Sequence, residues 1–204
     1  LDPRTYRQEY EASFEDFAGK IFSEFQERHR NTAPPEKFDR TFLGVDWGDR
    51  NPAAIVIGYN KESGYWIVDE WHNENGQVVA EDVFRGHLVR LAKKWDVWRA
   101  YCDPSRPSSI LALRKLGQAG LGRAIKGYNP IEEGLAVINS LFHQDRLHVA
   151  PHLKYFIECA ESYHRKTDID GNIIDKVEDN QDDHVLDCTR YVLATIEVKR
   201  IIQR

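Results

Sequence analysis

Three short runs rich in β-branched and aromatic residues follow one another between residues 41 and 71, and they restrict the fold most. The runs are TFLGVDW (41–47), AAIVIGY (53–59) and YWIVDEW (65–71). Such runs are typical of strands. The gaps between them, Gly48 to Pro52 and Lys61 to Gly64, are short and suit hairpins. The block therefore predicts three antiparallel neighbouring strands.

After this block, helical and strand patterns alternate to the end of the chain. Apolar residues at helical spacing predict helices over 79–95, 107–117, 130–144 and 151–165, and from about Asp182 to Arg200. Strands are predicted at 98–103, 123–128 and 147–150, and a hairpin over 167–177 with its turn at Asp170-Gly171. Three antiparallel strands followed by this alternation predict an α/β fold: a mixed sheet with helices on both faces.

The first part of the chain looks different from the rest. Aromatic residues at three- and four-residue steps predict a helix over 5–30, and the stretch RNTAPPEKFDR (30–40) then breaks the pattern. We therefore expect residues 1–36 to be a helical tail or linker left from a preceding domain and 37–204 to be the domain itself. The chain contains no Met, and we expect it to be a fragment of a longer protein.

Composition excludes several classes of function. No run reaches the ~18 apolar residues of a membrane helix. Cys102, Cys159 and Cys188 form no CxxC pair, so we expect buried thiols in a reducing compartment. There is no P-loop, GxGxxG or HExxH motif. The net charge of −5 argues against a general nucleic-acid coat, yet a DNA enzyme remains possible if metal ions supply positive charge locally.

Three aspartates stand at the ends of predicted elements. Asp46 ends the first strand, Asp103 ends the fourth, and Asp183 begins the last helix. If the first and fourth strands are neighbours, these side chains gather at one edge of the sheet, where ligands collect. Three carboxylates in one cleft repel one another. Mg²⁺ or Mn²⁺ would compensate them, and two such ions roughly 4 Å apart can hydrolyse a phosphodiester.

Each acid also has an ordinary explanation when it is taken alone. An Asp after a strand is often a turn former or helix cap, and Asp182 and Asp183 suit the positive end of a helix dipole. Asp187 is better explained as the partner of Arg190 on one helix face. His184 is a metal ligand, a proton carrier or an ordinary polar residue.

Taken in order, the motifs GVDWG (44–48), YCDPS (101–105) and DHVLDCTRY (183–191) resemble the nuclease domain of the large terminase subunit, the DNA-packaging motor of tailed phages. The segment YRQEYEASFEDFAGKIFSEF (6–25) is also similar to the end of the family's ATPase domain. The resemblance spans nearly the whole chain, and its last motif is the most specific.

This resemblance implies a ribonuclease H-like fold and two-metal endonucleolytic cutting of double-stranded DNA with Mg²⁺ or Mn²⁺. It implies that Asp46 bridges both ions, that Asp103 and Asp183 each hold one, and that Asp182 is an alternate ligand. His184 and Asp187 would support this set. It further implies an N-terminal ATPase domain in the full-length protein, the portal protein and the small terminase subunit as partners, and the cytoplasm of an infected bacterium. We expect the isolated domain to be monomeric and away from membranes.

A packaging nuclease must cut with little sequence preference, so its contacts should go to phosphates. The candidates are Arg50, Arg106, Lys166 and Lys176. Three alternatives stay open. They are another ribonuclease H-like nuclease of the junction-resolvase type, a non-catalytic domain that docks on DNA or portal, and an ATPase of the actin-like class, whose first phosphate loop is similar to GVDWGDRNPAAIVIG (44–58).

Overall fold

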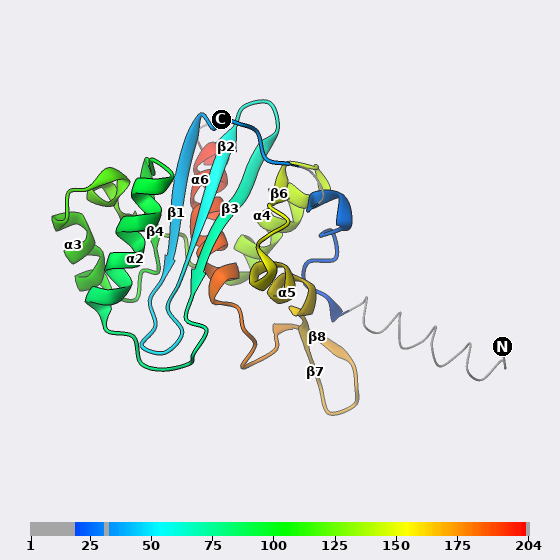
Figure 1. Cartoon of the computed structure of the whole chain (residues 1–204). Helices are drawn as coiled ribbons and strands as arrows, with labels where there is room; N and C mark the ends of the chain where they lie inside the picture. Colours follow the sequence, from blue (N-terminus) through cyan, green and yellow to red (C-terminus); the bar gives the residue numbers. More distant parts are fainter. Residues whose placement is uncertain (1–18, 31–32, 203–204) are drawn as a thin grey trace.

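A six-stranded mixed sheet forms the centre of the protein, whose computed structural model describes residues 19–30 and 33–202 of the chain (Figure 1). The strand order is β5-β4-β1-β2-β3-β6. The first three strands are antiparallel neighbours, as predicted, and β4 lies parallel to β1 on its other side. The strands are β1 (Arg40–Asp46), β2 (Ala53–Asn60), β3 (Gly64–His72), β4 (Arg99–Cys102), β5 (Ile125–Lys126) and β6 (Leu147–Val149).

Helices cover both faces of this sheet, which confirms the predicted α/β class. The helices α4, α5 and α6 share one hydrophobic core with the sheet, and α2, α3 and the short helix η2 share the other. No helix in the described ranges is both long and apolar enough to cross a membrane. The bounds are α2 (Glu81–Lys94), α3 (Pro107–Lys115), η2 (Ala119–Arg123), α4 (Ile131–His143), α5 (Lys154–Ser162) and α6 (His184–Ile202).

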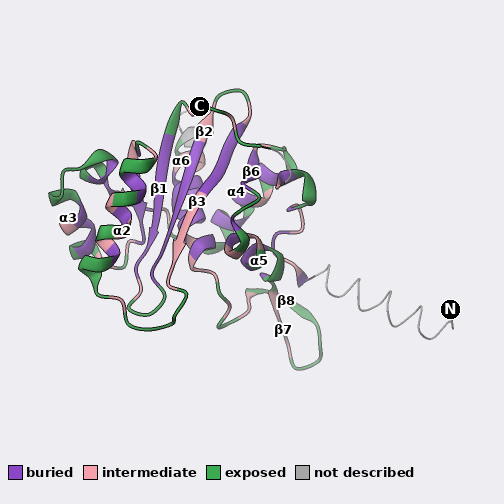
Figure 2. Ribbon diagram, viewed as in Figure 1, coloured by how far each residue is buried: buried purple, intermediate pink, exposed green. Residues whose placement is uncertain are grey.

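Alternation along β1 decides which side chains meet α6. Phe42 belongs to the core on the α6 side, whereas Leu43 and Val45 belong to the core on the other side. Because side chains alternate across a strand, Gly44 and Asp46 face the same way as Phe42. The strands are buried through most of their length, as Figure 2 shows.

Gly44 allows α6 to approach β1 closely. A Cβ atom at this position would lie 2.3 Å from the backbone oxygen of Cys188. The Cys188 thiol in turn donates to the carbonyl of Ala53 at 3.2 Å. Backbone cannot give way as a flexible side chain can, so the glycine of the GVDWG motif fixes α6 against the strand that carries Asp46.

The predicted helix over residues 5–30 is wrong for its described part. Lys20 forms an isolated β-bridge with His164, and the short helix η1 spans only Glu27–His29. Residues 5–18 lie outside the described residues. The aromatic side chains that suggested a helix are instead taken up by the core on the α6 side, where Phe22 and Phe25 are buried.

His29 ties this segment to the body of the protein. Its ring is fully buried; Nδ1 accepts from the Gln26 backbone N–H at 3.0 Å, and Nε2–H donates to the Phe142 carbonyl at 3.0 Å. The part of the segment that is described therefore packs with the domain. The boundary at residue 36 stays a prediction.

The predicted hairpin forms a small sheet of its own. It consists of β7 (Arg165–Thr167) and β8 (Ile173–Val177), and Gly171 adopts a φ of 84° at the turn, which a glycine tolerates. Because β7 begins at Arg165, α5 ends three residues earlier than predicted, at Ser162. The hairpin is mostly exposed (Figure 2).

Glu70, on β3, makes stability depend on pH. Its Oε2 accepts the Phe156 backbone N–H at 2.9 Å, and burial raises its pKa to about 7, partly offset by hydrogen bonds from the backbone. A raised carboxyl pKa contributes stability below the unfolded pKa that is lost as pH rises through the folded one. We expect the Glu70 contribution to the free energy of unfolding to fall by about 1–2 kcal/mol between pH 4.5 and 7, after discounting for solvent screening.

The measurement is urea unfolding of the parent and of Glu70→Gln across this range. Gln keeps an acceptor for the helix N-terminus but does not ionise, so the variant should lose most of this pH dependence. The same slope in both proteins would assign it to other groups.

Candidate metal-dependent active site

The parallel pairing of β1 with β4 brings Asp46 and Asp103 to one edge of the sheet. Val45 and Cys102 are register partners, and the Asp103 backbone N–H donates to the Val45 carbonyl at 2.8 Å. Both aspartates come directly after this last β1–β4 register pair, and both are largely buried. The two acids were expected to gather at one edge if the first and fourth strands are neighbours, and the pairing of β1 with β4 meets that condition.

The start of α6 closes over the same edge. His184 Nδ1 lies 2.8 Å from Asp46 Oδ2. Since a carboxylate only accepts, this hydrogen bond requires the imidazole proton to be on Nδ1. His184 thus contacts Asp46 directly and fixes the orientation of its carboxylate.

Asp46 lies at the centre of the negative charge. Burial raises its pKa to about 6; the hydrogen bond from His184 lowers it, and the charges of Asp187 and Asp103 raise it. The Tyr191 pKa is raised first by burial and then by Asp187, Asp46 and Asp103. The negative charges of Asp46, Asp103 and Asp187 therefore lie close enough to influence the same groups. An added cation would be favoured there.

Asp187 is neutralised by a buried arginine, as its helical spacing predicted. Its Oδ1 accepts from Arg190 Nε at 3.1 Å and from Nη2 at 2.7 Å. Arg190 is 1% exposed, and its Nη1 donates to the Asn129 carbonyl at 2.6 Å. A Cβ on Gly134 would lie 2.4 Å from the Arg190 side chain, so α4 has a glycine where the arginine passes.

Asp182 and Asp183 are neighbours in sequence but line different cavities. Asp183 lines a groove of about 1000 Å³ together with Asp187 and Lys176. Burial raises the Asp183 pKa, and the Tyr163 hydroxyl lies 3.4 Å from its Oδ2.

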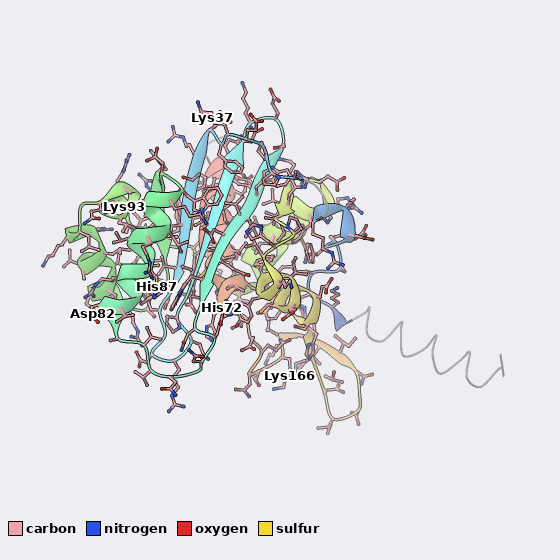
Figure 3. The ribbon with its side chains drawn as sticks, viewed as in Figure 1. Lys37, His72, Asp82, His87, Lys93 and Lys166 are labelled. Atoms are coloured by element: carbon pink, nitrogen blue, oxygen red, sulfur yellow. The ribbon has the colours of Figure 1, made fainter. Side chains whose placement is uncertain are left out.

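Asp182 lines a separate pocket of about 340 Å³ with His72 and His184. The His72 ring stacks on Tyr155 at 3.7 Å, and burial lowers its pKa. Sequence reasoning missed His72, although it ends the third strand at the same edge as Asp46; that position was its only signal. His72 is labelled in Figure 3.

Comparison with known proteins gives this arrangement a context. No protein-family model matches the chain. The terminase large subunit of Escherichia phage T5 is 24% identical over 168 residues, which are 78% of this chain and 37% of that protein. The large terminase of a thermophilic bacteriophage, also solved with ADP, is 20% identical, with a TM-score of 0.76 over 88% of this chain and 45% of that one.

The g2p large-terminase nuclease domain of bacteriophage SPP1, solved with bound Mn, is 26% identical, with a TM-score of 0.61 over 78% of this chain and 88% of that one. The chain resembles phage large-terminase nuclease domains in sequence and in fold. The ribonuclease H-like fold expected from the sequence is thereby confirmed. The chain spans only 37% of the T5 protein and 45% of the thermophilic phage terminase, so the activities and partners of those whole proteins are proposals here.

In this terminase-like nuclease fold, the carboxylate oxygens of the acids are suitable ligands for a hard divalent ion, although they do not form a complete coordination shell. Within the described residues, no three His, Cys, Asp or Glu side chains stand together as a ready-made metal ligand set. Oxygen donors are nevertheless what Mg²⁺ and Mn²⁺ take, and burial first, then the neighbouring carboxylates, raise the Asp46 pKa, so a cation there would be favoured. The donor set therefore fits such ions.

The predicted DNA contacts fall into two groups around the edge. Arg50 follows β1, and Arg106 pairs with Asp49 at 2.9 Å, which joins the loops after β1 and β4. On the hairpin side, Lys166 pairs with Asp179 at 2.5 Å and Lys176 lines the larger groove. Figure 3 shows Lys166 at the hairpin end of the molecule. Their role in binding DNA stays a prediction.

Proposed function

We propose that this chain is the nuclease domain of a large terminase, a metal-dependent endonuclease that cleaves double-stranded concatemeric viral DNA during genome packaging. One observation carries the proposal. Asp46, Asp103 and the start of α6 meet at one sheet edge, where burial and neighbouring carboxylates raise the Asp46 pKa to about 6. The likeness to the SPP1 nuclease domain, solved with Mn, supports it.

Asp46, Asp103 and Asp183 are the residues proposed to hold two Mg²⁺ or Mn²⁺ ions, with Asp182 as an alternate ligand. The ions would supply positive charge for the scissile phosphate and activate water. Asp103 is oriented for this by Ser105, whose N–H donates to Oδ1 at 2.8 Å and whose hydroxyl donates to Oδ2 at 2.5 Å. His184 holds the Asp46 carboxylate in the same way.

Asp183 is a better ligand than Asp187 because its oxygens are less engaged. Two Arg190 nitrogens, Nε and Nη2, already donate to Asp187 Oδ1, whereas no described cation pairs with Asp183, whose Oδ2 lies at the longer distance of 3.4 Å from the Tyr163 hydroxyl. We expect Asp183→Asn to reduce the cutting rate at least about 100-fold and Asp187→Asn much less. The measurement is the initial rate of plasmid nicking at saturating Mn²⁺. Equal losses would give Asp187 a place among the ligands.

The decisive test of the function is supercoiled plasmid incubated with the domain and Mn²⁺, Mg²⁺ or EDTA. We expect nicking and linearisation with either ion and none with EDTA. No cutting under any condition would favour the non-catalytic docking alternative. A strong preference for a four-way junction over linear duplex would favour the resolvase type, and nucleotide binding would favour the actin-like class.

Duplex binding should depend steeply on salt and little on sequence. Removing one phosphate-binding cation lowers the slope of log affinity against log salt by about 0.9. Lys166→Ala with Lys176→Ala should therefore flatten the slope by up to about 1.8 on two unrelated duplexes. The matched control, Lys93→Ala with Lys115→Ala, removes the same charge from exposed positions of α2 and α3. An equal effect in the control would show that the two hairpin lysines do not contact DNA phosphates.

Within a full-length protein, the proposal places this domain after an N-terminal ATPase domain. Portal protein and small terminase subunit are the proposed partners, and the cytoplasm of an infected bacterium is the proposed location. The isolated domain is proposed to be monomeric. The likeness to the thermophilic phage large terminase, of which this chain covers 45%, supports the presence of a further domain.

A further inference from the structure

Three arginines gather on one tryptophan at the end of the sheet opposite the acids. The guanidinium carbons of Arg99, Arg40 and Arg123 lie 4.3, 4.4 and 5.6 Å from the Trp98 ring centroid. Phe42 holds the tryptophan from the core, edge to face, with 6.0 Å between ring centroids. The Trp98 cluster, meaning Trp98 with these three arginines, is therefore anchored to β1 and β4 rather than carried on a loop alone.

The cluster lacks anionic partners within the described chain. No described carboxylate forms an ion pair with Arg40, Arg99 or Arg123, and Arg99 Nε is buried without a hydrogen-bond partner. Cation–π contacts with the ring stabilise such a group only weakly. Six other described arginines do have carboxylate partners: Arg28, Arg30, Arg85, Arg106, Arg165 and Arg190.

A pocket of about 410 Å³ opens beside the cluster. Its lining combines Arg40, Arg123 and Trp98 with the aromatic Phe38 and with Asp39 and Asp96. Guanidinium forks bind carboxylate or phosphate oxygens in pairs. The aromatic rings add an apolar surface, and the two aspartates place negative charge on the rim. Such a pocket suits an anionic group that belongs to a short segment with apolar residues beside it.

The DNA that is cut at Asp46 is not the natural occupant. Arg40 begins β1 and Asp46 ends it, so the strand separates them by about 20 Å. In Figure 3, Lys37 marks the end of the molecule where β1 begins and Lys166 marks the opposite end. Guanidinium groups already lie over the Trp98 ring, so a base could stack there only by displacing them. Asp39 and Asp96 would repel a continuous phosphodiester chain.

We propose that the Trp98 cluster is a docking site for an acidic protein segment, whose side-chain carboxylates bind Arg40 and Arg123, the two arginines that line the pocket. The proposal goes beyond the nuclease function and does not depend on it. Charge complementarity carries it: guanidinium groups without carboxylate partners converge in a chain whose net charge is −5. An acidic segment also tolerates the mixed charges of the rim, because it can place apolar residues between its carboxylates.

The test measures fluorescence anisotropy of a short fluorescein-labelled peptide rich in Glu and Asp, with its Gln and Asn counterpart as the neutral probe. The parent should bind the acidic peptide at least about tenfold more tightly than the neutral one. Arg40→Ala with Arg123→Ala should remove this preference. Arg85→Ala with Arg90→Ala, which removes the same charge from α2, should keep it. Arg123→Gln alone, with a partial loss expected, serves if the double variant melts early.

Two results would overturn the proposal. One is a parent that binds both peptides equally. The other is a double variant whose affinity for duplex DNA falls as much as its affinity for the peptide, which would make the cluster a nucleic-acid contact. Plasmid cutting by the double variant should match the parent. A failure of the nuclease proposal would therefore appear in the cutting assay, and a failure of docking only in the peptide assay.

Discussion

Asp46→Asn should abolish metal-dependent plasmid cutting, by about 1000-fold or more, while the protein stays folded. The Asp46 carboxylate accepts a hydrogen bond from His184, and the charges of Asp103 and Asp187 act on it. It is therefore the acid most central to the proposed ion site. An amide is a poor ligand for a hard cation, and metal catalysis supplies several kcal/mol of barrier lowering. The measurement is the single-turnover nicking rate at saturating Mn²⁺.

The stability of the same variant separates a catalytic loss from a folding loss. The Asp46 pKa is raised to about 6, so its ionisation opposes folding as pH rises through that value. Asp46→Asn should therefore be at least as stable as the parent at pH 8 in EDTA. It should also lose the stabilisation that Mn²⁺ gives to a folded site. Asp82→Asn, on the exposed side of α2 (Figure 3), is the matched control and should cut normally. Retained cutting by Asp46→Asn would rule out the two-ion assignment.

Arg190→Ala should cost about 3–5 kcal/mol of unfolding free energy, the largest loss expected of any single ion-pair change here. The side chain is 1% exposed and makes hydrogen bonds to Asp187 and to the Asn129 carbonyl. Its removal leaves a negative charge half-buried beside Asp46 and a void between α4 and α6. Chemical unfolding by urea measures the loss directly.

Arg165→Ala is the control for Arg190→Ala because that arginine also pairs with two acids, Glu132 and Asp175, but at the surface. It should cost at most about 1 kcal/mol. Adding Asp187→Asn to Arg190→Ala should recover part of the stability, since the uncompensated charge disappears. A double variant as unstable as the sum of the singles would show that Arg190 acts through packing alone.

Much of the fold followed from local patterns in the sequence. Runs rich in β-branched and aromatic residues with short gaps between them predicted three antiparallel strands, and the Asp170-Gly171 pair predicted the hairpin, whose glycine has a φ of 84°. These features depend on neighbours in the chain, where backbone sterics decide. The positions of Asp46 and Asp103 at strand ends were read in the same way, and the parallel pairing of β4 with β1 brings them together.

Other features depended on which surfaces meet, and only the tertiary structure decided them. The aromatic spacing of residues 19–30 looked helical, yet Phe22 and Phe25 are buried in a segment of turns and one short 3-10 helix, because core burial outweighs weak helix propensity. Asp182 and Asp183 looked equivalent but face different pockets.

The Trp98 cluster joins residues from β1, β4 and η2 that no local pattern connects. The sequence determined which acids and cations this protein has and at which ends of its elements they stand. The close approach of α6 to Gly44 decided which of the acids interact electrostatically, because that interaction depends on distance in space and not along the chain.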